Sequence, residues 1–397
     1  MALTDFQEQF DNAYEEFFMK TLVAKDIANT RFESKLKYGE SVERFAYDIS
    51  NVLVRSVTRG SASTIDTITD STELLTINIE KEAAFHISDG EVTQAGPLNP
   101  GETIGAKVAY KVAAWLDGRV FQEVSNALYT FDNGDLTTLS ASGTAITLSS
   151  TTVPQMVSRM PAKLRYRNQQ EVTTNMALVV DSYAASDITQ YLMGKSIDLA
   201  GATFKNGYAG DVHNAQLYVS ENLEGQVTLV VDVASADETI TILGVTFTAK
   251  ASPASAGEFD IGADADTQGA TIANMINGSS TGLNSPTGYY EVSEANRAIL
   301  NNAGVVATYT AATDTLSIVA YGRIIFSTTM SGTVTNKLHC YYGKKGAIDL
   351  VVQDLSPVDM RPTADRRGTN VFSSVLGGVK TFADGAKKFL DVWVLVS

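Results

Sequence analysis

The chain has 397 residues, of which 44% are hydrophobic and 19% charged, a balance that supports buried cores and differs from that of disordered chains. Because this length exceeds the size at which one hydrophobic core usually stops growing, we expect more than one folding unit. The formal net charge of -15 disfavours tight binding of nucleic acid, which needs clustered Lys and Arg. The single cysteine, Cys340, excludes an internal disulfide, and no apolar run suits a signal peptide or a membrane span.

The N-terminal stretch has the apolar spacing of an amphipathic helix. Apolar residues recur at steps of three and four at Phe6, Phe10, Tyr14, Phe17, Phe18 and Leu22. Acidic residues occupy the other face. The spacing predicts a helix within an N-terminal arm, and we expect this helix to be retained, since no long leader segment precedes the next element.

The stretch from Ile49 to Ala95 changes to the period of two that is typical of strands. Apolar positions alternate with mostly polar ones at Leu75, Ile77, Ile79, Ala83, Phe85 and Ile87. An earlier run contains Val52 and Val54. The intervening segment, Arg59 to Ser71, consists mostly of Gly, Ser, Thr and Asp and is predicted to be the exposed tip of a long hairpin.

A long helix is predicted after Pro97 and Pro100. One face holds Ile104, Val108, Val112, Trp115, Leu116, Val120, Val124 and Leu128, and Asn133 and Gly134 are expected to stop it. At 1.5 Å per residue the helix would run roughly 40 Å. Because the apolar spacing is not sustained as heptads, we expect a helix packed on a sheet and not a coiled coil.

A second helix is predicted from Thr152, a capping residue, and Pro154, a first-turn proline. Its apolar face would carry Val157, Met160 and Leu164. The apolar run Met176 to Val180 then predicts a buried strand.

Residues 225–336 differ in texture, being rich in Thr, Ala, Gly and Asp, and are predicted to form a separate module. Strands are expected at Val227–Val233, Thr239–Ala249 and Thr315–Val319. Asp264 or Asp266 would cap a short helix that bears Ile272, Met275 and Ile276. After the module, Ile348–Val352 and the closing residues Phe389, Val392, Val394 and Val396 predict further strands.

The three histidines, His86, His213 and His339, are isolated from one another in sequence and are interpreted as structural. His339 and Cys340 are adjacent, but adjacent residues of a strand face opposite sides, which argues against a thiol and imidazole pair.

Four short motifs also receive structural interpretations. Gly194, Lys195 and Ser196 match the end of a phosphate-binding loop, but Thr189 stands where its first glycine is required. Asp264, Asp266 and Gly269 match the start of a calcium loop, but Gln268 and Met275 occupy later ligand positions, so capping is favoured over a weak surface cation site. Asn277, Gly278 and Ser279 form a glycosylation triplet that is interpreted as a turn. Arg361, Arg366 and Arg367 lie near Asp359 and Asp365 and predict a solvated or inter-subunit salt-bridging surface.

We therefore predict no catalytic, cofactor-binding or metal-binding residue, no cofactor and no enzymatic activity.

Six segments of the chain resemble the Hong Kong 97-type fold of tailed-phage capsid proteins. They are LLTINIEKEAAFHISDGEVTQ, ETIGAKVAYKVAAWLDGRVFQEV with its buried Asp117, NMALVVDSYAASDITQYL, NGYAGDVHNAQLYVSENL, HCYYGKKGAIDLVVQDL and FSSVLGGVKTFADGAKKFLDVWVLV. They resemble, in order, the family's extended-loop strand, spine helix, opening axial strand and helix, glycine-turn segment, and the closing axial and peripheral strands. Residues 225–336 interrupt this pattern and resemble small modules inserted in phage capsid and tail proteins.

The resemblance implies an α+β fold. Its parts would be an N-terminal arm at 1–48, an extended hairpin loop at 49–95, a peripheral domain with the spine helix at 96–150, axial segments at 151–224 and 337–360, an insertion domain at 225–336, and peripheral C-terminal strands at 361–397.

The function implied is that of a major capsid protein, which self-assembles into the icosahedral shell enclosing the double-stranded DNA of a tailed phage. Its partners would be copies of itself in hexamers and pentamers and a portal protein, with scaffolding and decoration proteins as further candidates. It would enclose DNA without sequence-specific binding, contact no membrane, assemble in the bacterial cytoplasm and reside in the virion capsid. Because Lys81 is the hairpin's only lysine and lies outside the tip, a shell without covalent crosslinks is expected. The alternatives are a bacterial nanocompartment shell protein and a phage tail-tube or adhesion protein.

Overall fold

The computed structural model describes residues 10, 12–13, 22–32, 40–48, 52–56, 59–60, 65–88, 100–168, 174–193, 208–212, 215–362 and 367–396. The fold mixes helices and strands, as the predicted α+β class requires. The chain divides into two compact units. The first comprises Met1–Leu116 with Lys345–Phe389, and the second Asp117–Lys344 with Leu390–Ser397.

The first unit contains a three-stranded antiparallel sheet in the order β16-β17-β3. Its strands are β3 (Ile79–Ile87), β16 (Asp349–Pro362) and β17 (Thr369–Lys380). Buried and half-buried residues alternate along β17, the pattern of a sheet that buries one face. Two short helices, α2 (Val23–Ile27) and α9 (Ala383–Ala386), belong to the same unit.

The hairpin is built from β1 (Ser41–Asp48) and β2 (Thr69–Thr76), which pair antiparallel along their whole length. The predicted first strand around Val52 and Val54 is therefore wrong: residues 52–56 form no strand, and β1 lies in the segment assigned to the N-terminal arm. The alternation from Leu75 to Ile87 is also not one strand. The strand breaks at Ile77, between β2 and β3, and β2 pairs with β1 whereas β3 pairs with β17. The apolar alternation nevertheless continues across the break, because Leu75 of β2 and Ile79 of β3 are both buried at odd-numbered positions.

Of the predicted N-terminal helix, Phe10 and Ala13 are described, helical and buried, and Leu22 is buried just before α2. The other predicted apolar positions of that helix lie outside the described residues.

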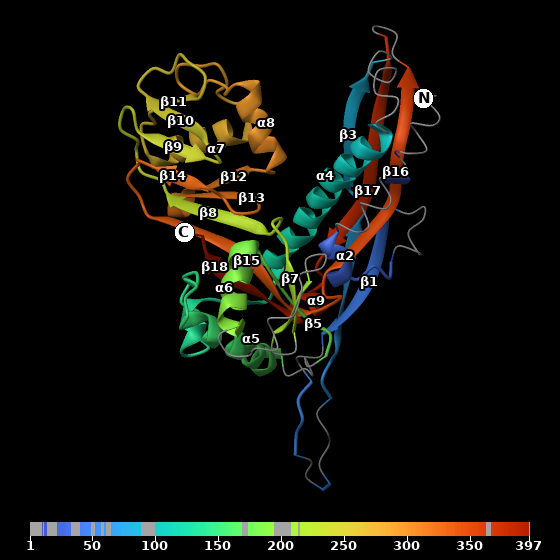
Figure 1. Ribbon diagram of the computed structural model, residues 1–397. Helices are drawn as coiled ribbons and strands as arrows, with labels where there is room; N and C mark the ends of the chain where they lie inside the picture. The colour runs from blue at the N-terminus through green and yellow to red at the C-terminus, as the bar shows by residue number, and fades with distance from the viewer. Residues whose placement is uncertain are drawn as a thin grey trace. The chain divides into compact units, whose positions relative to one another are not determined.

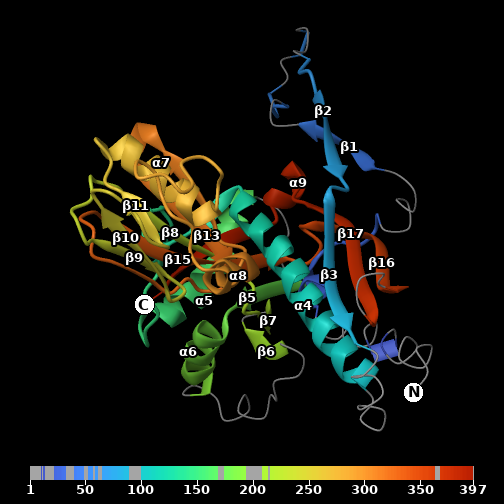
Figure 2. The ribbon, with the colours of Figure 1, turned by 90° about the horizontal axis from the view of Figure 1, so that it is seen from above.

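Helix α4 (Pro100–Gln122) is the long helix of the chain; its 23 residues correspond to about 34 Å. Figures 1 and 2 both show its first part alongside β3, where the Lys81 ammonium lies 5.8 Å from the centre of the Trp115 ring. Asp117 is buried, as predicted. The predicted continuation to Leu128 is wrong, because a 3-10 helix, η2 (Glu123–Asn126), follows and Leu128 is exposed.

Asn133 and Gly134 begin an element instead of ending one. Strand β4 (Tyr129–Phe131) leads into the 3-10 helix η3 (Asn133–Leu136). Asp132 caps η3 by accepting a hydrogen bond from the Gly134 N–H at 2.9 Å, while Asp135 accepts one from the Asp132 N–H at 3.0 Å. This reciprocal capping box explains why the Asn-Gly signal misled the prediction.

The second unit is organised on a nine-stranded sheet. Seven strands follow the order β12-β13-β8-β15-β5-β7-β6, and β18 pairs with β15 and β4. The strands not yet given are β5 (Met176–Val180), β6 (Tyr208–Val212), β7 (Ala215–Val219), β8 (Glu224–Val230), β12 (Val306–Thr310), β13 (Thr315–Tyr321), β15 (Val334–Lys344) and β18 (Phe389–Leu395).

Two predictions within this unit are confirmed. Helix α5 (Thr152–Asn168) begins at Thr152 and buries Val157, Met160 and Leu164, although Ser149 and not the predicted Thr152 accepts N–H groups at its start. Every residue of β5 is buried. Helix α6 (Ser182–Met193) follows β5 directly.

Residues 225–336 add a second, four-stranded sheet in the order β11-β10-β9-β14. Its strands are β9 (Thr239–Ile242), β10 (Val245–Lys250), β11 (Glu258–Asp260) and β14 (Phe326–Thr328). The strand predicted over Thr239–Ala249 is instead a hairpin that turns at Leu243 and Gly244, both with positive φ. The same stretch contains the helices α7 (Ala265–Asn277) and α8 (Glu294–Asn302) and the 3-10 helix η5 (Ala311–Thr313).

Helix α7 matches its prediction closely. The Asp264 carboxylate caps it by accepting the Thr267 N–H at 2.8 Å, and Ile272, Met275 and Ile276 are buried. A hydrophobic core formed entirely by residues between Val227 and Met330 holds this stretch together.

The strands cross the predicted boundaries of residues 225–336. β8 and β15 are paired by hydrogen bonds, and the pairing extends across both boundaries. Residues 225–336 therefore share one continuous sheet with the rest of the second unit. β16 likewise runs through the predicted boundary at 360. Within the part of the chain that the structure describes, no helix combines the length and apolarity that a membrane span requires.

Candidate functional sites: the hairpin arms and a buried polar cluster

Two segments without strand structure, residues 52–56 and 65–68, extend beyond β1 and β2 and form the two hairpin arms. An ion pair between Arg55 and Asp66 holds the arms together. The Arg55 guanidinium donates hydrogen bonds to both carboxylate oxygens of Asp66, each at 2.7 Å. The Leu53 N–H also donates to Asp66 at 2.9 Å. These bonds hold the pKa of Asp66 below its usual range, with Arg55 as the main cause. Figure 1 shows the two arms running side by side away from the paired strands.

The arms carry large apolar side chains that are left in solvent. Val54 is fully exposed, Ile65 is 90% exposed and Leu53 is 60% exposed. Isolated exposed apolar residues are ordinary, but several on one narrow hairpin mark a surface for another molecule. The sequence pattern predicted the exposed tip but not the Arg55–Asp66 pair, since the two residues lie in segments that contain no strand.

The two described histidines, His86 and His339, both contact side chains on other strands. His86 Nδ1 lies 2.9 Å from the side-chain oxygen of Asn370 on the neighbouring strand β17. His339 and Cys340 are both buried on β15, and His339 bonds to Asp391 and not to the thiol. Burial raises the pKa of the Cys340 thiol well above its usual value, which disfavours a nucleophilic thiolate. His213 lies outside the described residues.

The short motifs mostly serve the fold. Met275 is buried in the core, and Gln268 is buried while its side-chain oxygen accepts the Gly262 N–H at 2.8 Å, so neither residue is placed as a calcium loop requires. Gly278 adopts φ 63° and ends α7, so the triplet at Asn277 is a turn, as predicted. Gly194, Lys195, Ser196, Asp365 and Arg366 lie outside the described residues.

The predicted basic surface is partly described. Arg361 forms an ion pair with Asp359 at 2.6 Å, and its guanidinium carbon lies 5.3 Å from the centre of the Phe372 ring. Arg367 is exposed. Among the described residues, no group of three or more His, Cys, Asp or Glu side chains has the geometry to hold a metal ion.

A buried polar cluster lies in the second unit where β8, β15 and β18 meet. Glu224 begins β8 and is 7% exposed, and its cross-strand partner is His339 on β15. His339 Nδ1 lies 2.8 and 2.9 Å from the carboxylate oxygens of Asp391 on β18. Trp393 donates its indole N–H to the same carboxylate at 2.7 Å. Lys337 lies two residues before His339, with its ammonium 3.3 Å from the centre of the Trp393 ring.

Burial perturbs the cluster's titration. The pKa of Glu224 is raised to about 7, chiefly by burial; His339 opposes the rise, the Asp391 charge adds to it, and a hydrogen bond from Ser125 and the Lys337 charge also oppose it. Burial also lowers the pKa of Lys337. Sequence reasoning treated His339 as an isolated residue and missed Glu224 and Asp391. The available signal was Asp391, a lone acidic residue inside the apolar run FLDVWVL.

A second ionic contact joins β5 to the loop before β14. The Arg323 guanidinium pairs with the buried Asp181 carboxylate, and its carbon lies 4.7 Å from the centre of the Tyr183 ring. Asp181 also accepts the Ala184 N–H at 3.0 Å, which caps α6. This contact fixes residues 225–336 to the α6 end of β5.

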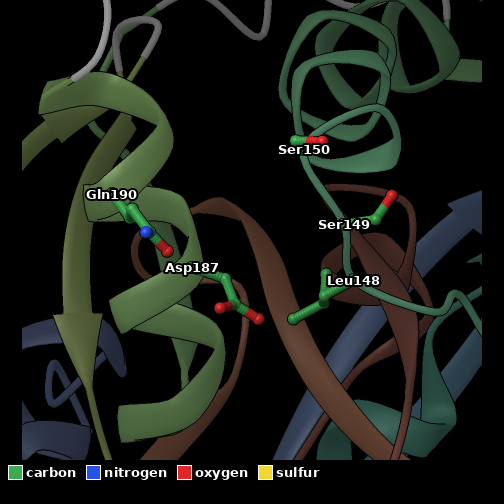
Figure 3. A pocket seen from close by; sticks show the side chains of 5 residues that line it. All are labelled: Leu148, Ser149, Ser150, Asp187 and Gln190. Carbon is green, nitrogen blue, oxygen red and sulfur yellow. The ribbon is translucent and has the colours of Figure 1, made fainter.

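A shallow pocket of about 270 Å³ lies between α6 and the segment before α5. Figure 3 shows Asp187 and Gln190 of α6 facing Leu148 across it, with Ser149 and Ser150 on the opposite rim. Ser149 Oγ accepts the N–H groups of Thr151 and Thr152, so it serves the start of α5. The lining offers no arrangement of nucleophile, base and anion-stabilising donors.

No family model matches the chain, and no curated protein matches it. Among solved structures, the chain is similar to the capsid of Ralstonia phage GP4, with 8% identity, coverage of 93% of this chain and 87% of that chain, and a TM-score of 0.47. It is also similar to a structure from Mycobacterium phage Che8, with 12% identity, coverage of 92% and 89%, and a TM-score of 0.46. A third similar structure is the capsid of the cyanophage P-SCSP1u, with 11% identity, coverage of 90% and 84%, and a TM-score of 0.43.

Proposed function

We propose that this chain is the major capsid protein of a tailed phage and that it assembles with copies of itself into the shell that encloses the viral DNA. The observation that carries the proposal is the pair of hairpin arms, which the Arg55–Asp66 ion pair holds together while Val54 and Ile65 remain in solvent. A two-stranded hairpin is marginally stable by itself, so such a surface is best explained by packing on a neighbouring subunit.

The order of elements along the chain supports the same role. A hairpin, a long helix beside a sheet, and then a mixed sheet and helix unit follow the order in which the six segments resemble the Hong Kong 97-type fold. By that resemblance, residues 49–95 correspond to the extended loop, 96–150 and 361–397 to the peripheral part, and 151–224 and 337–360 to the axial part, so each compact unit contains residues of both parts.

The implied partners and location belong to the same proposal. The subunits would form hexamers and pentamers in the virion capsid, with a portal protein at one vertex and with scaffolding and decoration proteins as candidate partners. The net charge of -15 suits a wall that repels phosphate, so that packed DNA is enclosed without sequence-specific binding. The role requires no catalytic site, and we propose that the chain is not an enzyme.

Residues 225–336 are proposed to be an insertion domain. Their hydrophobic core is their own, and they follow the short turn between β7 and β8. We place this domain on the outer surface of the shell, where an insertion disturbs neighbouring subunits least.

Electron microscopy of the purified chain tests the proposal, because a shell protein forms rings of five or six subunits or closed particles. Val54→Lys combined with Ile65→Lys places two charges on the exposed apolar arms, and we expect a folded subunit that no longer assembles. Ser56→Lys adds a charge to an exposed polar position of the same arm and is expected to assemble normally.

The images also separate the alternatives. Tubes or fibres would favour the tail-tube or adhesion protein, and shells that enclose a protein cargo in place of nucleic acid in native particles would favour the nanocompartment. A double-lysine variant that assembles as well as Ser56→Lys would show that the arms are not an assembly surface.

A further inference from the structure

The polar cluster at the start of β8 joins residues 225–336 to two other strands of the sheet. β8 is the first strand of that stretch, β15 is the strand that leaves it, and β18 comes from the C-terminal end of the chain. Glu224, His339 and Asp391 are each less than a tenth exposed. Whatever charge the cluster carries is therefore shielded from bulk water and acts directly on how these strands are held together.

The two ring nitrogens of His339 contact side chains on two other strands. Its Nδ1 faces Asp391, and its Nε2 lies 3.2 Å from the side-chain oxygen of Gln226. Gln226 presents this oxygen because its amide nitrogen donates to Ser317 Oγ at 2.9 Å. Side chains from β18 and β8 therefore contact the two ring nitrogens of His339, so the imidazole links these strands to β15.

Burial acts most directly on Glu224, raising the pKa of its carboxyl group to about 7. The groups that face it are His339 and Lys337 from β15, Asp391 from β18 and Ser125 from η2, whose hydroxyl lies 3.4 Å from its carboxylate. Its cross-strand neighbour on β13 is Tyr321. η2 also contains Glu123, whose carboxylate accepts a hydrogen bond from Asn126. Within the part of the chain that the structure describes, the groups that act on Glu224 include no guanidinium.

We propose that the buried cluster of Glu224, His339, Lys337 and Asp391 forms a proton-operated latch, in which a proton on Glu224 holds β8 against β15 and β18 and loss of this proton loosens residues 225–336. The reason is that ionisation places another anion in a site already desolvated and already occupied by Asp391. The latch belongs to the folded subunit, so it does not depend on assembly into a shell.

The direction of the effect follows from linkage. The pKa of Glu224 is about 7 in the folded chain, above its ordinary value of 4.5, so the folded state binds a proton that the opened state releases. The stabilisation is complete below pH 4.5, is lost as the pH rises through 7, and changes little above that. Between pH 6 and pH 8, opening of β8 should become about tenfold more favourable on this account.

The indole of Trp393 provides a local reporter, because it donates to Asp391 and lies under Lys337. Trp115 is the chain's only other tryptophan, so Trp115→Phe isolates the signal in the full-length chain. We expect the fluorescence of Trp393 to titrate with a midpoint near 7. Glu224→Gln should abolish this transition, and Glu294→Gln, an exposed acid on α8, should leave it unchanged.

Two further measurements keep the proposal testable if Glu224→Gln folds poorly. Ser125→Ala removes a hydrogen bond that favours the ionised carboxylate, so it should move the midpoint to higher pH. Hydrogen exchange of the β8 amides, corrected for intrinsic rates, should show opening that is about tenfold more frequent at pH 8 than at pH 6. A transition that survives in Glu224→Gln, a midpoint unmoved by Ser125→Ala, or equal opening at the two pH values would each overturn the latch.

Discussion

At the scale of single residues, the ion pairs of the second unit differ chiefly in burial. Lys163 and Asp135 are both buried, and their pair sits beside the capping box of η3. Lys250 and Asp237 form a pair of similar geometry that is exposed to solvent. Breaking a buried pair leaves one charge without water or a partner, whereas breaking an exposed pair returns both charges to water.

Replacing Lys163 with Met should therefore destabilise the chain markedly. The Asp135 carboxylate would keep only the Asp132 N–H as a partner, because its second oxygen is already buried without a hydrogen-bond partner. We expect a loss of about 3 kcal/mol in the free energy of unfolding, measured by urea denaturation of the full chain. Lys250→Met should change stability little.

The double variant Lys163→Met with Asp135→Asn separates an unpaired charge from lost packing. Removing the carboxylate's charge should recover part of the stability lost in the single variant, so the two changes should not add. Strict additivity would show that the Lys163 side chain matters through its packing on Phe131, whose ring centre lies 5.8 Å from its ammonium.

Residue roles were predictable where their partners are close in sequence. The Asp264 cap acts over three residues, and the burial of Met275 follows from helical spacing. Glu224 and Asp391 could not be paired with His339 from sequence. They lie on three strands brought together by the sheet, and nothing local to each strand specifies its neighbours.

At the scale of elements, the edge strand β12 has a device that limits further strand pairing. Asn277, at the end of α7, accepts the Ala307 N–H with its side-chain oxygen and donates its amide to the Ala307 carbonyl, both at 2.8 Å. These are the groups that an added strand would use at this position. An exposed edge is a template for association, so one asparagine serves both the fold and solubility.

Asn277→Ala should destabilise the chain by about 1–3 kcal/mol, because Ala307 is buried and would lose partners for both backbone groups. Urea denaturation measures this loss, and sedimentation at several concentrations measures the added self-association that the opened edge should cause. Asn277→Asp should fall between, since a carboxylate accepts the N–H but cannot donate to the carbonyl. Asn301→Ala, on the exposed last turn of α8, is the matched control. Equal stability of Asn277→Ala and Asn301→Ala would contradict the edge role.

Elements with a strong internal period were predicted well, and those shaped by capping or pairing were not. α5, α7 and β5 follow from their apolar spacing. The end of α4 was misplaced because η2 keeps Val124 buried after the α-helical bonds have ended. β1 was missed because it pairs with β2 across 20 intervening residues, between Asp48 and Thr69, and such a distant partner cannot be recognised from the local sequence pattern.

At the scale of the whole molecule, residues 225–336 combine their own core with a shared sheet. The core lies entirely between Val227 and Met330, which favours independent folding. The pairing of β8 with β15 and the Arg323–Asp181 contact tie the same residues to the rest of the second unit. Sequence texture identified the stretch but could not reveal that its first and last strands are neighbours in one sheet.

Excising residues 225–336 and joining Glu224 to Lys337 through a short Gly-Ser linker tests whether this stretch is an independent domain or an integral part of the sheet. The join is short because Gly225 pairs directly with Leu338. We expect the remaining chain to fold, as judged by far-ultraviolet circular dichroism and a cooperative thermal transition, but to be destabilised.

Loss of Arg323 leaves the buried Asp181 carboxylate without its ion pair, so adding Asp181→Asn should raise the melting temperature of the excised chain. The isolated stretch 224–336 should unfold cooperatively on its own core. If the excised chain is unfolded even with Asp181→Asn, the shared sheet is indispensable, and residues 225–336 are an integral layer of the second unit and not an insertion domain.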